Sequence, residues 1–287
     1  MIQSAATMGV ALVVMGASMA TLDINVNVRV SERESETALP LMNYNHALYS
    51  FGFAAAALAV GAAQRAGFGP EQIQPAMALL LVLAAAMMIE RQVPLLPADT
   101  AGGRTPWPVV WPAAAILFAA FVTENATESW SALHIERTFA TRPGEGAFGP
   151  ATMGLTMGIG RMAGQMLAAR VGEARLVAGS AVLAAIGALM VGLAPVQWGA
   201  VLGVGIIGAG IAVLVPSANS LLGRRVAPAQ IGLAISRAWM IGFTGFFIGP
   251  VVMGLMAQAI GLRAAFAVVA LVVATILLSL RRLTRQA

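Results

Sequence analysis

The sequence lacks cysteine and lysine, and it is poor in charged and aromatic residues. All 17 basic residues are arginine, charged residues make up 10% of the chain and aromatic residues 6%. The absence of cysteine excludes disulfides, thiolate metal sites and cysteine nucleophiles. With so few charges and a mean hydropathy of +0.83, the chain has more apolar surface than a soluble core can bury. The composition therefore predicts an integral membrane protein.

The apolar residues fall into long continuous runs. A hydrocarbon core about 30 Å thick needs roughly 20 apolar residues per helix. Strands that cross a membrane show alternating runs of about ten residues instead, so a β-barrel is excluded. The sequence predicts an all-α membrane protein with nine transmembrane helices, near residues 3–28, 44–65, 72–90, 111–133, 149–168, 176–194, 197–221, 230–259 and 262–280.

The arginines are distributed unevenly between the two sides of these spans. By the positive-inside rule, the richer side faces the cytoplasm, which places the C-terminus there and Met1 outside. The first residues carry no basic segment, so we expect no cleaved signal peptide. The net charge of +5 is thus a topology signal, and no nucleic-acid partner is predicted. The richer side holds Arg29, Arg33, Arg91, Arg104, Arg170, Arg175, Arg224, Arg225, Arg281, Arg282 and Arg285; the other holds Arg65, Arg137, Arg142 and Arg263.

One segment interrupts the apolar pattern and divides the chain. Residues 92–110 contain four prolines and two glycines, which cannot continue a helix. We interpret this segment as a cytoplasmic linker. It would join a partial N-terminal bundle of three helices, residues 1–91, to a complete six-helix bundle, residues 111–287.

The two bundles share an internal repeat. Gly16–Asn27 has an ungapped echo in Gly208–Asn219, where glycine, alanine, leucine and asparagine fall in register. After one inserted residue, the S-F-G-F that begins at Ser50 aligns with the F-T-G-F that begins at Phe243. The period is six helices, an arrangement typical of secondary transporters. Spans seven to nine would then repeat spans one to three, and three helices equivalent to spans four to six are expected to precede this chain.

Four segments are similar to a known family. They are L-D-I-N-V-N from Leu22, H-A-L-Y-S-F-G from His46, E-N-A-T-E-S-W-S-A from Glu124 and G-F-F-I-G-P-V-V-M-G from Gly245. In these segments the chain resembles the major facilitator superfamily, near the bacterial sugar and fucose permeases. The resemblance implies a two-bundle fold with helices equivalent to four to twelve of twelve. It also implies multi-pass insertion in the bacterial inner membrane and transport of a small solute, without a cofactor.

The first group of candidate site residues lies in the fourth span. Ionisable groups at bilayer depth are costly, by about 2.5–3.5 kcal/mol on insertion scales, and usually mark functional sites. Glu124 and Glu128 share a helix face and are predicted to bind protons or solute. The alternative for Glu128 is a solvated position at the membrane interface, without a role in binding. Asn125 can bind a solute or a neighbouring helix, and Trp130 is a solute platform or an interfacial anchor.

The second group is predicted to lie toward the cytoplasm. Asp23 and Asn27 share a face of the first span, His46 opens the second, and Arg237 enters the eighth. The resemblance implies an Asp23–Arg237 contact between the bundles at an inner gate. A structural polar pair within one bundle is the alternative. His46 is either a pH sensor or a solvated residue at a helix end.

We therefore predict a proton-coupled secondary transporter that works by alternating access in the lipid bilayer. The alternative is a truncated or regulatory membrane protein without transport of its own. No metal-binding or nucleophile constellation is present in the sequence, so we do not predict an enzyme. Gly249 and Pro250 are expected to kink the eighth span.

Overall fold

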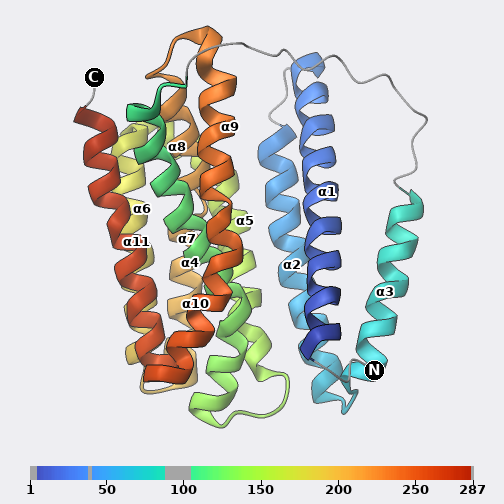
Figure 1. The fold of residues 1–287 in the computed structure, drawn as a ribbon. Coiled ribbons are helices and arrows are strands. Elements are labelled where there is room, and N and C mark those ends of the chain that lie inside the picture. The colour runs from blue at the N-terminus through green and yellow to red at the C-terminus, as the bar shows by residue number, and fades with distance from the viewer. Residues whose placement is uncertain (1–4, 38–40, 88–104, 286–287) are drawn as a thin grey trace.

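The computed structural model describes residues 5–37, 41–87 and 105–285, and every regular element in these ranges is a helix (Figure 1). The α-helices are α1 (Ala5–Thr37), α2 (Leu41–Arg65), α3 (Pro70–Met87), α4 (Trp107–Phe139), α5 (Phe148–Val171), α6 (Glu173–Leu193), α7 (Gln197–Ile211), α8 (Leu214–Gly223), α9 (Ile231–Gly242), α10 (Thr244–Ile260) and α11 (Leu262–Arg285). Two single-turn 3-10 helices, η1 (Glu145–Ala147) and η2 (Pro228–Gln230), lie in connecting loops.

Helices α4 to α11 form one bundle around a shared apolar core. The core residues all lie between Val110 and Leu283, and α4 crosses the centre of the bundle, in contact with α8, α9, α10 and α11. Alanine and glycine at many crossings bring the helix backbones close together, as is usual where apolar helices pack in a membrane. This packing holds α4 and α5, which carry the candidate site, in fixed positions.

The three N-terminal helices pack differently. Helix α2 lies along α5, and α1 lies against α2. Helix α3 stands to one side and buries none of its residues (Figure 1). The joint between the N-terminal and C-terminal parts of the described chain is therefore mainly the α2–α5 contact.

Seven helical segments within the described residues are long and apolar enough to cross a membrane. They correspond to seven of the nine predicted spans, and two are each built from consecutive helices, α7–α8 and α9–α10. The other two predicted spans, near 3–28 and 149–168, are the helices α1 and α5, which are not among the seven. Helix α5 carries Arg161 and several glycines, which lower its mean hydropathy. The multi-pass helical fold is confirmed, and the count of nine spans stays a prediction.

One predicted boundary is wrong. Helix α4 begins at Trp107, so residues 107–110 of the predicted linker are helical; the first-turn Pro108 lacks only an N–H that has no partner in a helix anyway. Residues 88–104 of that linker lie outside the described part of the chain. In the eighth span, Pro250 lies inside α10 and the helix is interrupted at Phe243, two turns earlier; the kink expected at Gly249 and Pro250 stays a prediction. Around this break, Phe121 of α4 packs edge-on against Trp239 and Phe243.

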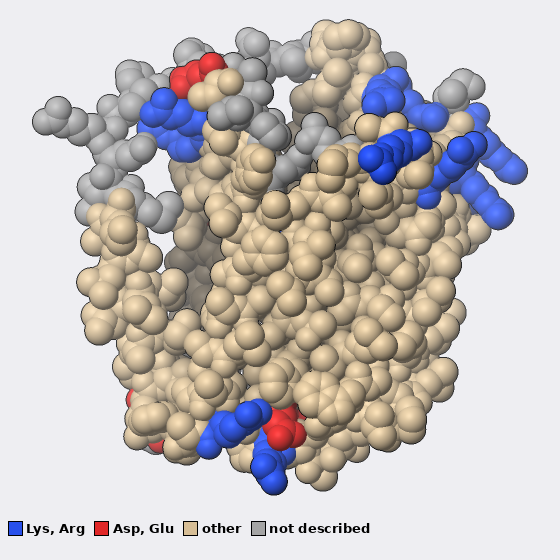
Figure 2. All heavy atoms as spheres, turned by 180° about the vertical axis from the view of Figure 1, so that it is seen from behind, with Lys and Arg blue, Asp and Glu red and all other residues tan. Residues whose placement is uncertain are grey.

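The arginines gather at the two ends of the bundle, with a broad uncharged band between them (Figure 2). The end of α5 and the end of α11 lie at the same end as the C-terminus (Figure 1). We call this the arginine-rich end, because it carries Arg170, Arg175, Arg224, Arg225, Arg281, Arg282 and Arg285. Arg91 and Arg104, counted on the same side from the sequence, lie outside the described residues. Which end faces the cytoplasm stays a prediction.

One buried histidine ties three helices of the C-terminal bundle together. His134 of α4 is fully buried, and its Nε2 lies 3.2 Å from the Val191 carbonyl oxygen of α6. Because a carbonyl only accepts, Nε2 carries the proton, and Nδ1 accepts a hydrogen bond from the Thr138 hydroxyl at 3.2 Å. The ring also packs against Phe266 of α11. We therefore regard His134 as a structural residue.

Candidate functional site

A polar cluster lies where α2, α4 and α5 meet, in the middle of otherwise apolar helices. Nη1 of Arg161 in α5 donates to the His46 carbonyl oxygen at 3.1 Å and to the Ser50 hydroxyl, both in α2. Its Nη2 donates to Oε1 of Glu124 in α4 at 3.2 Å. We call these four residues the Arg161 cluster. One guanidinium thus joins the N-terminal and the C-terminal parts of the chain.

Local helix geometry brings the two α2 groups to one arginine. His46 and Ser50 are four residues apart, so they share a helix face, and the Ser50 hydroxyl donates to the His46 carbonyl at 2.9 Å. The planar guanidinium offers five donors in a fixed arrangement, which suits it to contact several acceptors at once. Arg161 therefore donates hydrogen bonds to both a side chain and a backbone carbonyl of α2.

The ion pair in this cluster is shielded from solvent. The side chain of Arg161 is 17% exposed and that of Glu124 is 11% exposed. Removing one partner of such a buried pair costs about 3–5 kcal/mol, because the other charge stays buried without compensation. The pair therefore couples the charge of Glu124 to the position of Arg161, and through it to α2.

Further ionisable groups surround the cluster. Glu128, one turn from Glu124, interacts electrostatically with both Glu124 and Arg161. Asp23 of α1 interacts with His46, which also feels the charge of Arg161. Residues from both predicted groups, the proton or solute pair and the gate, thus come together around one arginine.

Two predicted solute-binding residues have protein partners. Asn125 is 9% exposed and its Oδ1 accepts a hydrogen bond from the Ser129 hydroxyl at 3.4 Å. The indole Nε1 of Trp130 donates to the Pro250 carbonyl oxygen of α10 at 3.0 Å, and the ring lies against Gly254. Trp130 therefore joins α4 to α10 at the proline of the eighth span.

Among the other predicted gate residues, Asp23 pairs with Asn27 and not with Arg237 in the described structure. Nδ2 of Asn27 donates to Oδ1 of Asp23 at 3.0 Å within α1. Arg237 is exposed in α9, and the ion pairs found between described side chains involve Arg33, Arg161 and Arg224. The contact between Asp23 and Arg237 stays a prediction.

From the cluster toward the arginine-poor end, glycines of α5 allow α2 to approach closely. A Cβ added to Gly154 would lie 2.7 Å from the Ser50 carbonyl oxygen, and one added to Gly158 would lie 2.5 Å from the Phe51 ring. Nearer that end, Gly61 of α2 is in the same close contact with the backbone of Gly144, which has a φ of +82°. We call this contact surface the α2–α5 seam, and it closes one end of the joint between the two parts.

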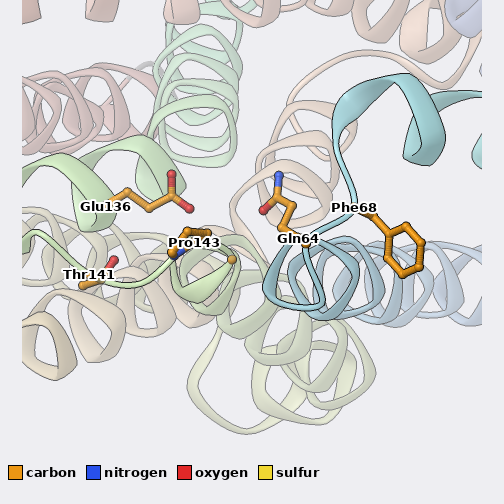
Figure 3. Close-up of a pocket in the computed structure, with 7 residues that line it drawn as sticks. Gln64, Phe68, Glu136, Thr141 and Pro143 are labelled. Atoms are coloured by element: carbon orange, nitrogen blue, oxygen red, sulfur yellow. The ribbon is translucent and has the colours of Figure 1, made fainter.

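A cavity of about 370 Å³ lies beyond the seam, between the loops of the arginine-poor end. Figure 3 shows the side chains of Gln64, in the last turn of α2, and Glu136, on α4, entering it from opposite sides, while Phe68 points away. Thr141 also lines the cavity, and its buried hydroxyl has no hydrogen-bond partner. The cavity is therefore bounded by both parts of the chain.

The central residue of the site was not among the predicted ones. Arg161 lies within the predicted span 149–168, and an ionisable residue inside a span is the same signal that marks Glu124. Its partners could not be identified, because they lie 37 residues away at Glu124 and 115 residues away at His46. Within the described residues, no three histidine or acidic side chains are arranged to hold a metal ion.

Comparisons with known proteins relate the chain to membrane transporters. Residues 113–286 match the sequence profile of the Major Facilitator Superfamily. An uncharacterized MFS-type transporter of Yersinia pestis is 29% identical over 171 residues, 59% of this chain and 44% of that protein. Membrane protein MosC of Rhizobium meliloti is 30% identical over 146 residues, 50% of this chain and 35% of that protein. The chain thus spans less than half the length of these curated relatives.

Two solved structures share the fold. The E. coli fucose:proton symporter has a TM-score of 0.57 at 19% identity, over 75% of this chain and 59% of that protein. A peptide transporter crystallised with sulfate has a TM-score of 0.55 at 17% identity, over 62% of this chain and 38% of that one. At these identities the likeness concerns the fold alone.

Proposed function

Because the chain belongs to the Major Facilitator Superfamily, we propose that it moves a small solute across the bacterial inner membrane by alternating access, coupled to protons through Glu124. Proteins of this family are transporters, so the proposal includes no enzymatic reaction. The arginine-rich end is proposed to face the cytoplasm, following the positive-inside rule. The lipid bilayer, a small solute and protons are the proposed partners.

The observation that carries the proposal is the bridge formed by Arg161. A carboxylate of the C-terminal part and two acceptors of the N-terminal part are bound by the same guanidinium. A proton on Glu124 would remove the charge that opposes Arg161 in a solvent-shielded site. Arg161 would then be free to leave α2, and the two parts could separate at this point.

The α2–α5 seam supports the direction of that motion. The seam is closed from Ser50 to Gly61, toward the arginine-poor end. Its helices are so close that a Cβ on Gly154 or Gly158 would clash with α2. Apolar contacts of this kind can part and re-form without leaving charges unpaired. We propose that protonation of Glu124 and release of Arg161 favour opening of the seam toward the cavity of Figure 3.

Transport in vesicles tests this function. The chain is reconstituted with a pH-sensitive dye inside, and sugars and short peptides are added outside under an imposed pH gradient. We expect one solute class to accelerate proton entry, and Glu124→Gln to abolish uphill accumulation while leaving solute exchange. Glu71→Gln, an exposed carboxyl in the first turn of α3 and outside both the Arg161 cluster and the cavity, is the matched control and should behave as the parent.

Two results would contradict separate parts of the proposal. If no solute accelerates proton entry or accumulates, transport by this chain is refuted, and the alternative of a regulatory or truncated membrane protein gains support. If solute accumulates uphill in Glu124→Gln as in the parent, transport stands but Glu124 does not carry the coupling.

A further inference from the structure

The internal repeat makes a specific pair of residues comparable between the two parts of the chain. Asn27 of α1 corresponds to Asn219 of α8 in the ungapped echo. With the one-residue insertion that aligns Gly52 with Gly245, His46 of α2 corresponds to Trp239 of α9. The same two positions therefore occur on neighbouring helices in each part.

In the C-terminal part, these two positions are hydrogen-bonded. Nε1 of Trp239 donates to Oδ1 of Asn219 at 3.1 Å, which joins α9 to α8 where the chain turns at the arginine-rich end. An indole N–H is a donor only and does not titrate, so this bond is independent of pH.

In the N-terminal part, the equivalent acceptor is unused. Nδ2 of Asn27 donates to Asp23, which directs Oδ1 away from that carboxylate, and Oδ1 is buried without a hydrogen-bond partner. Such an atom is rare, because a buried acceptor without a donor carries its full desolvation cost. Helix α1 packs against α2, and His46 is close enough to Asp23, one turn from Asn27, to interact with its charge.

We propose that His46 is the donor for Asn27 Oδ1 and that this bond forms a pH-dependent latch between α1 and α2, equivalent to the fixed Trp239–Asn219 bond. His46 would be a positioning residue, since it sets where α2, and hence the acceptors of Arg161, lie relative to α1. The inference rests on the repeat and on the unused acceptor, and it stands whether or not Glu124 carries protons.

The donor chemistry of the imidazole determines the direction of the pH effect. The charged and titratable groups that face His46 are Arg161 on α5 and Asp23 on α1, and Tyr49 lies on the same helix. Glu124 on α4 offsets the charge of Arg161 through their ion pair. An imidazolium donates from both nitrogens and makes the stronger, charge-assisted bond. The latch is therefore expected to close at acidic pH and to loosen as the pH rises.

Spin labels can measure the latch directly because the chain has no cysteine. Met19 on α1 and Leu48 on α2 are exposed, at 44% and 69%, and can be replaced by cysteine for labelling. Pulsed electron paramagnetic resonance then gives the α1–α2 distance distribution of the purified chain at pH 5.5 and pH 8.5. We expect the ratio of near to far populations to rise roughly tenfold on acidification, as a charge-assisted bond replaces a neutral one.

Substitutions separate the latch from a general loss of structure. His46→Trp restores the donor found in the other part and should keep the near population at both pH values. His46→Phe and Asn27→Leu remove one partner each and should abolish the acid response. Trp239→Phe, the matched control, should leave it intact. The proposal is overturned if the parent shows no pH response, or if His46→Phe retains it; the measurement needs no transport activity.

Discussion

Replacing Arg161 by glutamine is expected to destabilise the folded chain by about 3–4 kcal/mol at pH 7. The variant leaves Glu124, which is 11% exposed, without a countercharge, and such a loss costs about 3–5 kcal/mol. The cost has a ceiling, because the carboxyl can take up a proton. Since an unfolded-state carboxyl has a pKa of about 4.3, this protonation costs close to 4 kcal/mol at pH 7.

The same reasoning gives a pH dependence and its sign. In the variant, the folded state holds the proton and the unfolded state releases it, so stability falls as the pH rises above about 4.3. At pH 5 the electrostatic deficit should shrink to about 1 kcal/mol. Unfolding by denaturant in detergent micelles, followed by circular dichroism at the two pH values, measures both quantities.

Two further variants test whether the effect belongs to the ion pair. Arg170→Gln removes an exposed arginine at the end of the same helix and should change stability by less than about 0.5 kcal/mol. The double variant Glu124→Gln with Arg161→Gln leaves two neutral amides and should recover about 2 kcal/mol relative to the sum of the single changes. Additive single changes, or an Arg161→Gln variant as stable as the parent at pH 7, would refute the reasoning.

Three other substitutions test the packing around the site in the same unfolding assay. Gly154→Ala puts a Cβ 2.7 Å from a backbone oxygen and should destabilise the chain by about 1–3 kcal/mol, whereas Gly179→Ala meets nothing within 4 Å and should be neutral or stabilising. Trp130→Phe loses the bond to the Pro250 carbonyl and should cost about 1 kcal/mol; in the vesicle assay an unchanged KM would mean that the indole does not bind solute. His134→Leu leaves the Val191 carbonyl without its donor and should cost about 1–3 kcal/mol, and stability equal to the parent would contradict a structural role.

Hydropathy predicted the helices well, because each span is a local property of about 20 residues. The last predicted span, 262–280, agrees closely with α11, Leu262–Arg285. The end of the predicted linker was wrong because proline can either interrupt a helix or begin one. Proline 108 was assigned to a linker, although a proline in the first turn costs a helix little. The interruption between α9 and α10 at Phe243 lies where this ring packs against Phe121 of α4, and such a tertiary contact cannot be predicted from a local pattern.

The sequence predicts which residues belong to the candidate site, but not which of them lie next to one another. The cost of burying charge in a membrane singled out Glu124 and Glu128 from the sequence alone. The sequence analysis placed Glu124 and Glu128 in one site and Asp23 and His46 in another, because their positions along the spans predict different depths in the membrane. Arg161 brings these residues together because α2 packs against α5, and no local pattern states which helices are neighbours.

The balance of charge in the site bears on the proposed release of Arg161 from α2. Three carboxyls, those of Asp23, Glu124 and Glu128, share the electrostatic environment of Arg161 through direct or intermediate contacts. Among the side chains that the structure describes, Glu124 is the one that forms an ion pair with it. A proton on Glu124 would leave Glu128, one turn along the same helix, as the other carboxyl of α4 that interacts with Arg161, and the released guanidinium could transfer to it. Such a transfer would carry Arg161 along α4, away from the acceptors on α2, without leaving its charge unpaired in the membrane.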